Sequence, residues 1–250
     1  MSNPRFLAHP YRTATYEVIS REIGESPGLF QMKLNVPYNR ECIETMRKIL
    51  RGGRVIISNL IPKTLHISAD SNDQIKRAAI LIPLINVNRK PSILFQLRSS
   101  TVGTHPSQVS FPGGHIDTKE TAIEASLREF HEELGCDITN DVVIIGECQT
   151  IPAITKTLVT PIIAYISKDY HELDIKPNAS EVERVFTRSL EELTDVNRNK
   201  EELLHRDNKS MKFPVFGIND NDEKIWGLTA LVLNSVLQKV ILPGHNTHNY

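Results

Sequence analysis

The middle of the chain contains five strand candidates, which are separated by polar or proline-containing connections. Short apolar runs with such boundaries are typical of strands in a sheet. The predicted strands cover residues 77–85, 92–97, 142–147, 159–167 and 183–188. The first two flank the turn-prone segment 88–91, so we expect them to be paired strands of one sheet.

Apolar residues at three- and four-residue spacing predict three helices. The first covers residues 40–50, with apolar positions at Cys42, Ile43, Met46, Ile49 and Leu50. The second carries one apolar stripe, formed by Ile123, Leu127, Phe130 and Leu134. The third has this spacing at Trp226, Thr229, Leu233, Val236, Leu237 and Val240. Pro243 and Gly244 end it, and we expect an amphipathic helix with Trp226 packed in the core.

Strands and helices together predict a mixed α/β class. We divide the chain into a helical N-terminal extension (1–70), a main domain closed by the last helix (71–241) and a polar tail (242–250). A chain of 250 residues with 40% hydrophobic and 24% charged composition is long enough to bury an ordinary core.

The net charge of −1 argues against a nucleic acid or an anionic membrane as partner, and favours a small soluble substrate. Three widely spaced cysteines, Cys42, Cys136 and Cys148, are expected to be free thiols in a reducing intracellular compartment. We find no apolar stretch long enough to span a bilayer and no C-terminal Ser-Lys-Leu signal. Mitochondrion and cytosol both remain open as locations.

The second helix carries Glu129, Glu132 and Glu133 on a face beside its apolar stripe. We expect Asp117 or Thr118 to cap its start, Gly135 to cap its end, and residues 111–114 to form a glycine turn before it. Carboxylates at i, i+3 and i+4 repel one another, and a divalent cation would neutralise them. The alternative is a solvated acidic face.

A basic residue on the same helix, Arg128, has two candidate partners. Glu124 lies four positions before it, and Glu120 precedes the helix. Either pair would leave the other carboxylates available for a metal ion.

This segment resembles the Nudix box. The matching positions are Gly114, Glu120, Arg128, Glu129, Phe130, Glu132, Glu133, Gly135 and Cys136. The resemblance implies a Nudix fold, a mixed β-sheet sandwiched between α-helices, and a metal-dependent pyrophosphohydrolase that uses Mg²⁺ or Mn²⁺. It implies Glu129 and Glu133 as principal metal ligands, assisted by Glu132 and by a carbonyl of Gly113 or Gly114.

The resemblance also implies a catalytic set consisting of Glu132, Glu129, Arg128, Glu120 and one acid outside the box. Glu181 and Glu183 are the candidates for that acid, with a solvated position at a strand edge as the alternative for either. His115 and His131 lie inside the box, and we expect both to be surface residues rather than ligands of a zinc ion.

Residues 93–114 resemble the second signature of coenzyme A diphosphatases, a Nudix subfamily. Arg98, Ser99 and the segment 111–114 match it, and this resemblance implies that Arg98, Ser99, Gly113 and Gly114 bind substrate. Gly103 stands where that signature has arginine, and Ser107 where it has glycine. Residues 213–214 and 225–230 resemble the same subfamily.

The implied reaction is hydrolysis of the diphosphate of coenzyme A, or of a derivative, to 3′,5′-ADP and 4′-phosphopantetheine or its acyl form. One alternative is another nucleoside diphosphate derivative, such as ADP-ribose, a dinucleoside polyphosphate or an oxidised nucleotide. The other is a catalytically silent Nudix module that binds a nucleotide.

Overall fold

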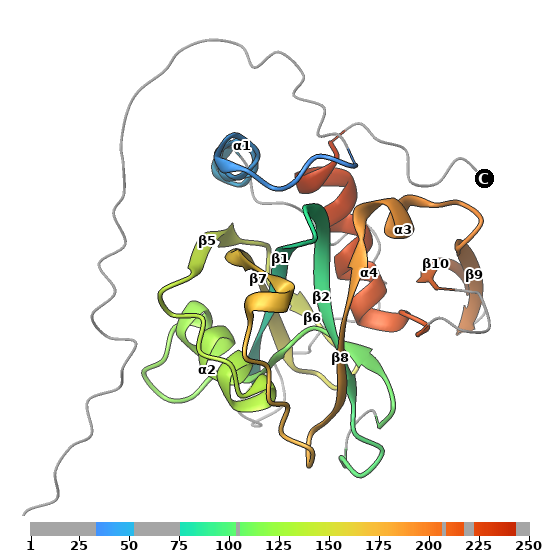
Figure 1. Ribbon diagram of the computed structural model, residues 1–250. Coiled ribbons are helices and arrows are strands. Elements are labelled where there is room, and N and C mark those ends of the chain that lie inside the picture. The colour runs from blue at the N-terminus through green and yellow to red at the C-terminus, as the bar shows by residue number, and fades with distance from the viewer. Residues whose placement is uncertain (1–33, 53–75, 104–105, 207–208, 218–222, 244–250) are drawn as a thin grey trace, which may run out of the picture. The chain divides into compact units, whose positions relative to one another are not determined.

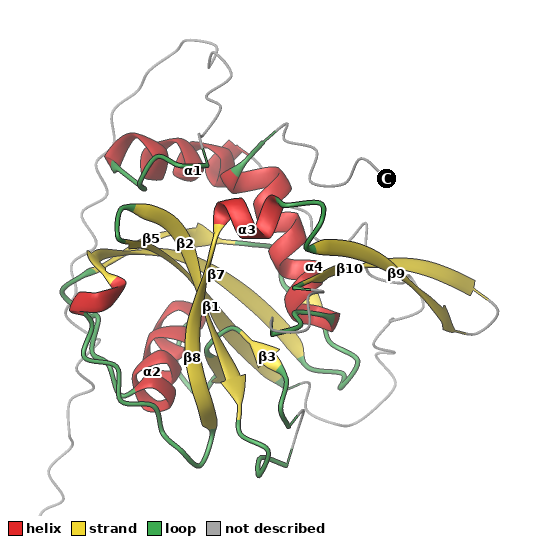
Figure 2. Ribbon diagram, turned by 45° about the vertical axis from the view of Figure 1, so that its right-hand side comes forward, coloured by secondary structure: helices red, strands yellow, loops and turns green. Residues whose placement is uncertain are grey.

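The computed structural model describes residues 34–52, 76–103, 106–206, 209–217 and 223–243, in which a mixed sheet has helices on both sides (Figures 1 and 2). The main sheet consists of β1 (Arg77–Val87), β2 (Lys90–Arg98), β3 (Val109–Ser110), β4 (Gly113–His115), β5 (Val142–Glu147), β6 (Ile151–Pro152), β7 (Leu158–Asp169) and β8 (Val182–Ser189). A separate hairpin contains β9 (Asn199–Arg206) and β10 (Lys209–Phe216).

The helices are α1 (Arg40–Gly52), α2 (Ala122–Leu134), α3 (Leu190–Thr194) and α4 (Gly227–Val236), with a 3₁₀ turn η3 (Tyr170–Glu172) and a π-helical turn η4 (Leu237–Ile241). Figure 2 shows α2 on one side of the sheet and α1 and α4 on the other. The sequence therefore predicted the α/β class and the sandwich of sheet and helices correctly.

Strand β1 organises the sheet. It runs parallel to β7, and its other edge is shared between two antiparallel partners, β4 along its first residues and β2 along its last. Leu81, Ile82, Leu84 and Ile85 are completely buried. A strand covered on both faces reads as a continuous apolar run. Because β2 and β4 pair with different parts of the same edge of β1, the sheet separates between these two strands, next to the predicted glycine turn.

Each of the five predicted strands corresponds to a strand of the main sheet, with ends shifted by zero to two residues. The predicted turn at 111–114 is wrong in part. The chain bends at Pro112, but Gly113 and Gly114 form β4 with His115 because they pair with Ala78, Ala79 and Ile80 of β1. The two- and three-residue strands β3, β4 and β6 are too short to leave an apolar pattern.

The closing helix differs from its prediction. Residues 230–237 are all buried, including Asn234 and Ser235, so α4 is not amphipathic. It packs against the β9–β10 hairpin as well as the sheet side, which leaves no solvated face. Trp226 is the N-cap and is 48% exposed, so the expectation that it packs in the core is wrong.

Helix α1 packs against β5, where Arg47 donates from Nη2 to the carbonyl of Ile144 at 2.8 Å. The remainder of the predicted extension, residues 1–33 and 53–70, and the tail from residue 244 lie outside the described residues. Cys42, Cys136 and Cys148 are buried free thiols, as predicted. Among the described helices, none has the length and apolar character needed to cross a membrane.

Candidate active site

Helix α2 begins one turn later than predicted. Thr121 accepts from the backbone N of Glu124 at 3.2 Å, while the Glu124 carboxylate accepts from the backbone N of Thr121 at 2.8 Å. This reciprocal capping box satisfies two donors that the helix leaves unpaired. Asp117, proposed as the cap, belongs to the preceding turn, where its carbonyl accepts from the backbone N of Glu120. The predicted C-cap is confirmed, because Gly135 adopts the left-handed conformation that glycine tolerates.

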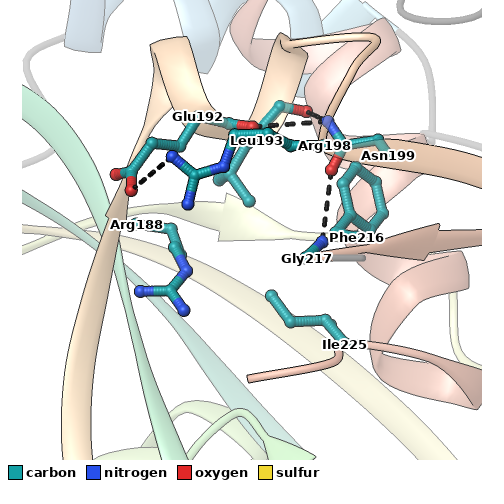
Figure 3. A pocket seen from close by; sticks show the side chains of 8 residues that line it. All are labelled: Arg188, Glu192, Leu193, Arg198, Asn199, Phe216, Gly217 and Ile225. Carbon is teal, nitrogen blue, oxygen red and sulfur yellow. Dashed lines mark hydrogen bonds and ion pairs between the residues drawn. The ribbon is translucent and has the colours of Figure 1, made fainter. Parts of the chain in front are cut away.

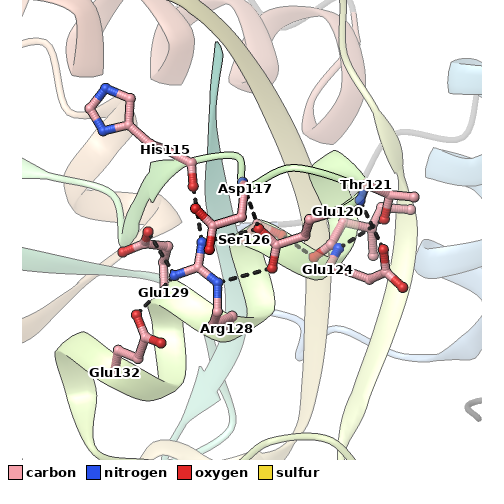
Figure 4. A network of polar contacts seen from close by, with 10 residues as sticks. His115, Asp117, Glu120, Thr121, Glu124, Ser126, Arg128, Glu129 and Glu132 are labelled. Atoms are coloured by element: carbon pink, nitrogen blue, oxygen red, sulfur yellow. Dashed lines mark hydrogen bonds and ion pairs between the residues drawn. The ribbon is translucent and has the colours of Figure 1, made fainter. Parts of the chain in front are cut away.

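Arg128 connects α2 to the loop before it (Figure 4). Nε and Nη2 donate to the two oxygens of Glu120 at 2.9 and 3.1 Å, and Nη2 also reaches the carbonyl of His115 at 2.9 Å. Nη1 donates to Glu129 Oε1 and Glu132 Oε2, both at 2.9 Å. The hydrogen bond with Glu120 is the largest of the effects that raise the pKa of Arg128. One guanidinium therefore neutralises parts of three carboxylates.

Of the two partners predicted for Arg128, the structure pairs it with Glu120. The Glu124 alternative is wrong, because the carboxylate of Glu124 is used in the capping box. His115 and His131 are exposed, as expected for surface histidines.

The side chain of Glu133 points the other way, towards the sheet. Glu133 is 3% exposed. Its Oε2 accepts a hydrogen bond from the backbone N of Gly113 at 2.9 Å, and its Oε1 lies 3.7 Å from Nη1 of Arg98 on β2. Burial raises the pKa of Glu133 to about 7, against the lowering effect of Gly113, Gln96 and Arg98. Any cation that Glu133 holds would therefore displace a proton below about pH 7.

Sequence reasoning missed Gln96. It lies on β2, is completely buried, and its amide lowers the pKa of Glu133 by hydrogen bonding. The signal was a lone amide inside the apolar run 92–97. Polar side chains buried in a strand have partners, so such a residue marks polar contacts on that face.

Glu129 lies in a crowded group of acids. Burial raises its pKa most, Arg128 lowers it, and the charges of Glu132 and Glu181 raise it further. Glu181 precedes β8, and its carbonyl accepts from the backbone N of Ser99 at 2.8 Å, which ties it to the end of β2. Glu183, the other candidate for the additional acid, is exposed on β8.

The remaining predicted substrate-binding residues lie near the end of β2. Arg98 pairs with Glu133, and the buried hydroxyl of Ser99 lies 2.8 Å from Thr101 Oγ1, inside the loop that follows the strand. The two positions that depart from the signature, Gly103 and Ser107, are exposed in this loop.

The acids suit a divalent cation. Within the described parts of the chain, no three acidic, histidine or cysteine side chains converge on one point, because Arg128 lies between Glu129 and Glu132 and Glu133 turns to Gly113. Carboxylate oxygens are hard ligands, and a cation would stabilise the charged form of Glu129, whose pKa is raised first by burial and then by the charges of Glu132 and Glu181.

A family model for the NUDIX domain matches residues 75–208, which is more than half of the chain and includes α2 and β8. This chain belongs to the Nudix family. It is thus a hydrolase of phosphoanhydride bonds, and Nudix hydrolases generally need divalent metal ions.

Relatives with 31–36% identity span two thirds or more of the chain. The mitochondrial coenzyme A diphosphatase NUDT8 of Mus musculus is 36% identical over 171 residues, covering 67% of this chain and 79% of that protein. The human protein of the same name is 32% identical over 170 residues, covering 67% and 70%. Nudix hydrolase 3 of Caenorhabditis elegans is 31% identical over 194 residues, covering 71% and 79%.

The two glycines of β4 permit close contacts of different kinds. A Cβ on Gly113 would lie 2.3 Å from the backbone carbonyl oxygen of Ala79, and a Cβ on Gly114 would lie 2.3 Å from Glu129 Oε1. Gly113→Ala is expected to destabilise this Nudix domain by about 1–3 kcal/mol, because the obstacle is backbone in the centre of the sheet. Gly114→Ala should lower kcat by about 100-fold with a smaller change in stability, because it displaces a carboxylate. Urea unfolding and initial rates on both variants measure the difference, and equal stability losses would contradict it.

Proposed function

We propose that this Nudix hydrolase cleaves the diphosphate of coenzyme A, or of an acylated or oxidised derivative, to 3′,5′-ADP and 4′-phosphopantetheine or its acyl form. The observation that carries the proposal is the salt bridge between Arg98 and Glu133, which joins the coenzyme A signature on β2 to the Nudix box on α2. The relatives named as coenzyme A diphosphatases support the same substrate.

The acids of α2 hold the metal ion in this proposal. Glu129 and Glu133 are the principal ligands of Mg²⁺ or Mn²⁺, with Glu132 and a carbonyl of Gly113 or Gly114 assisting. When bound, the metal withdraws charge from the diphosphate and lowers the pKa of an attacking water. The main-chain N–H of Gly113 holds Glu133 in place, so the strand β4 positions the ligand set.

Three other residues act around these ligands. Arg128 and Glu120 are positioning residues that fix the loop before α2 against the helix. Glu181, at the start of β8, is our candidate for the acid outside the box that accepts a proton from water, because its charge acts on Glu129. Arg98 and Ser99 shape the substrate-binding end of β2.

The relatives named as mitochondrial support a mitochondrial location, with the cytosol as the alternative.

The second candidate substrates are ADP-ribose, dinucleoside polyphosphates and oxidised nucleotides, because Gly103 and Ser107 depart from the coenzyme A signature. The presence of all box glutamates argues against a silent binding module.

Ranking substrates by kcat/KM tests the assignment. Coenzyme A, ADP-ribose and diadenosine tetraphosphate are compared at equal Mg²⁺ concentration. We expect coenzyme A or an acyl derivative to have the highest kcat/KM. A higher value for ADP-ribose or the dinucleotide would keep the Nudix chemistry and reject the coenzyme A assignment.

A further inference from the structure

A small pocket lies away from the acids of α2, between the end of β8, α3, the β9–β10 hairpin and Ile225 (Figure 3). Two arginines line it, Arg188 from β8 and Arg198 from the residues before β9. Glu192 is the acidic residue of the lining and pairs with Arg198 at 3.2 Å. Guanidinium groups stay charged at all physiological pH values, so both arginines can donate to an anionic ligand.

Buried hydrogen bonds fix one wall of this pocket. Asn199 is buried, and its Nδ2 donates to the carbonyls of Leu193 at 3.0 Å and Asp195 at 2.8 Å. Its Oδ1 accepts from the backbone N of Gly217 at 3.4 Å. The amide thereby joins α3 to both strands of the hairpin, and Arg198 is held beside it. A preorganised site loses less entropy when it binds a ligand.

The other wall continues into a stack of rings and guanidinium groups on β2 and β8. Arg188 lies 4.9 Å and Arg184 5.8 Å from the ring centroid of Phe186. Phe186 stacks on Phe95 at 5.8 Å, and Phe95 on Phe111 at 5.1 Å. Phe111 precedes Pro112 and the strand that contacts Glu133, so the stack is continuous with the candidate active site.

We propose that this pocket, together with the stack beside it, binds a phosphorylated nucleoside: the small pocket takes only the phosphate group, and the nucleoside lies outside it against the stack. Arg188 and Arg198 bind a phosphomonoester group, since guanidinium groups form paired hydrogen bonds with phosphate oxygens. The planar groups of Arg184 and Phe186 support the base, because nucleobases stack on aromatic rings and guanidinium planes. Arg184 also pairs with Glu223, which holds its guanidinium near the ring.

Two sources could supply this phosphate. One is the phosphate on the ribose of the substrate itself, a version that rests on the coenzyme A proposal above. The other is a separate nucleotide that binds beside the active site. Both need the same chemistry in the pocket, and they differ in whether Arg188 affects turnover.

Direct binding in EDTA tests the site without any hydrolysis. Adenosine 3′,5′-bisphosphate, 5′-AMP and adenosine are titrated by calorimetry and by the fluorescence of Trp226, which is the only tryptophan of the chain and follows Ile225 directly. We expect the bisphosphate to bind tighter than adenosine. Arg188→Gln should weaken its binding by about 10- to 100-fold, the size of a lost charge-assisted hydrogen bond.

The matched control is Arg51→Gln, which removes an exposed arginine from the last turn of α1 and should leave binding unchanged. Arg188→Lys keeps the charge and should restore part of the affinity. If Arg188→Gln does not stay folded, Arg198→Gln replaces it in the same titration. Equal affinity for adenosine and its bisphosphate, or unchanged binding in folded Arg188→Gln, would overturn the proposal.

Rates of coenzyme A hydrolysis then identify the source of the phosphate that binds in the pocket. If the pocket holds the substrate's own ribose phosphate, Arg188→Gln lowers kcat/KM for coenzyme A by a similar factor and leaves dephospho-coenzyme A unaffected. If bisphosphate binding falls while both rates stay unchanged, the ligand is a separate nucleotide. Absence of coenzyme A hydrolysis in the wild type would reject the proposed function and leave the binding result intact.

Discussion

Glu132→Gln is expected to lower kcat for diphosphate hydrolysis by about 100- to 10,000-fold, the range seen when a group that acts directly on water or its metal is removed. The substitution keeps the shape of the side chain and removes its charge. Because the Glu132 side chain is 52% exposed, the free energy of unfolding should change by about 0.5 kcal/mol or less. Initial rates and urea unfolding of the same preparation separate the two effects.

A matched substitution controls for loss of negative charge. Glu147 is an exposed glutamate at the end of β5, and Glu147→Gln should keep the wild-type rate. A Glu132→Gln variant with more than a tenth of the wild-type kcat would remove this residue from the catalytic set.

Arg128→Met should destabilise the domain by about 3–5 kcal/mol, the usual cost of removing one partner from a buried ion pair. The Arg128 side chain is 13% exposed, and its partners Glu120 and Glu129 are 11% and 17% exposed. Their carboxylates would stay largely buried without the guanidinium that neutralises them. The midpoint and slope of urea unfolding give the change in free energy.

Two further variants show how much of this loss of stability comes from the ion pairs of Arg128. Arg128→Lys keeps one charge but cannot contact Glu120 with two nitrogens, so we expect an intermediate stability. Arg51→Met, at the exposed end of α1, should cost about 0.5 kcal/mol or less. A loss below about 1 kcal/mol for Arg128→Met would show that the ion-pair network contributes little to folding.

The sequence predicted those strands and helices whose buried residues form an apolar run or an apolar stripe. The runs at 77–85 and 159–167 are strands covered on both faces. Of the predicted stripe on α2, Leu127, Phe130 and Leu134 are buried, while Ile123 is only partly buried. The hairpin β9–β10 was missed because β9 is mostly charged and polar, and the short apolar run of β10, residues 213–216, contains a proline, which argues against a strand. The closing helix was read as amphipathic because helical spacing also occurs by chance in a fully apolar segment.

The composition of the candidate site was also accessible, but its arrangement was not. The box named Glu129, Glu132 and Glu133, but spacing alone does not reveal that Glu133 turns towards Gly113 while Arg128 joins the other two. These contacts depend on β4 pairing with β1, a long-range feature. The cap at Thr121 does have a sequence signal, because Thr121-x-x-Glu124 is a capping-box pattern.

The most direct test of the central claim is mass-spectrometric product analysis after incubation of the purified protein with coenzyme A, in Mg²⁺ and in EDTA. We predict 3′,5′-ADP and 4′-phosphopantetheine in equal amounts with Mg²⁺ and neither product in EDTA. Intact coenzyme A under both conditions, from a preparation that hydrolyses ADP-ribose or a dinucleoside polyphosphate, would contradict the claim.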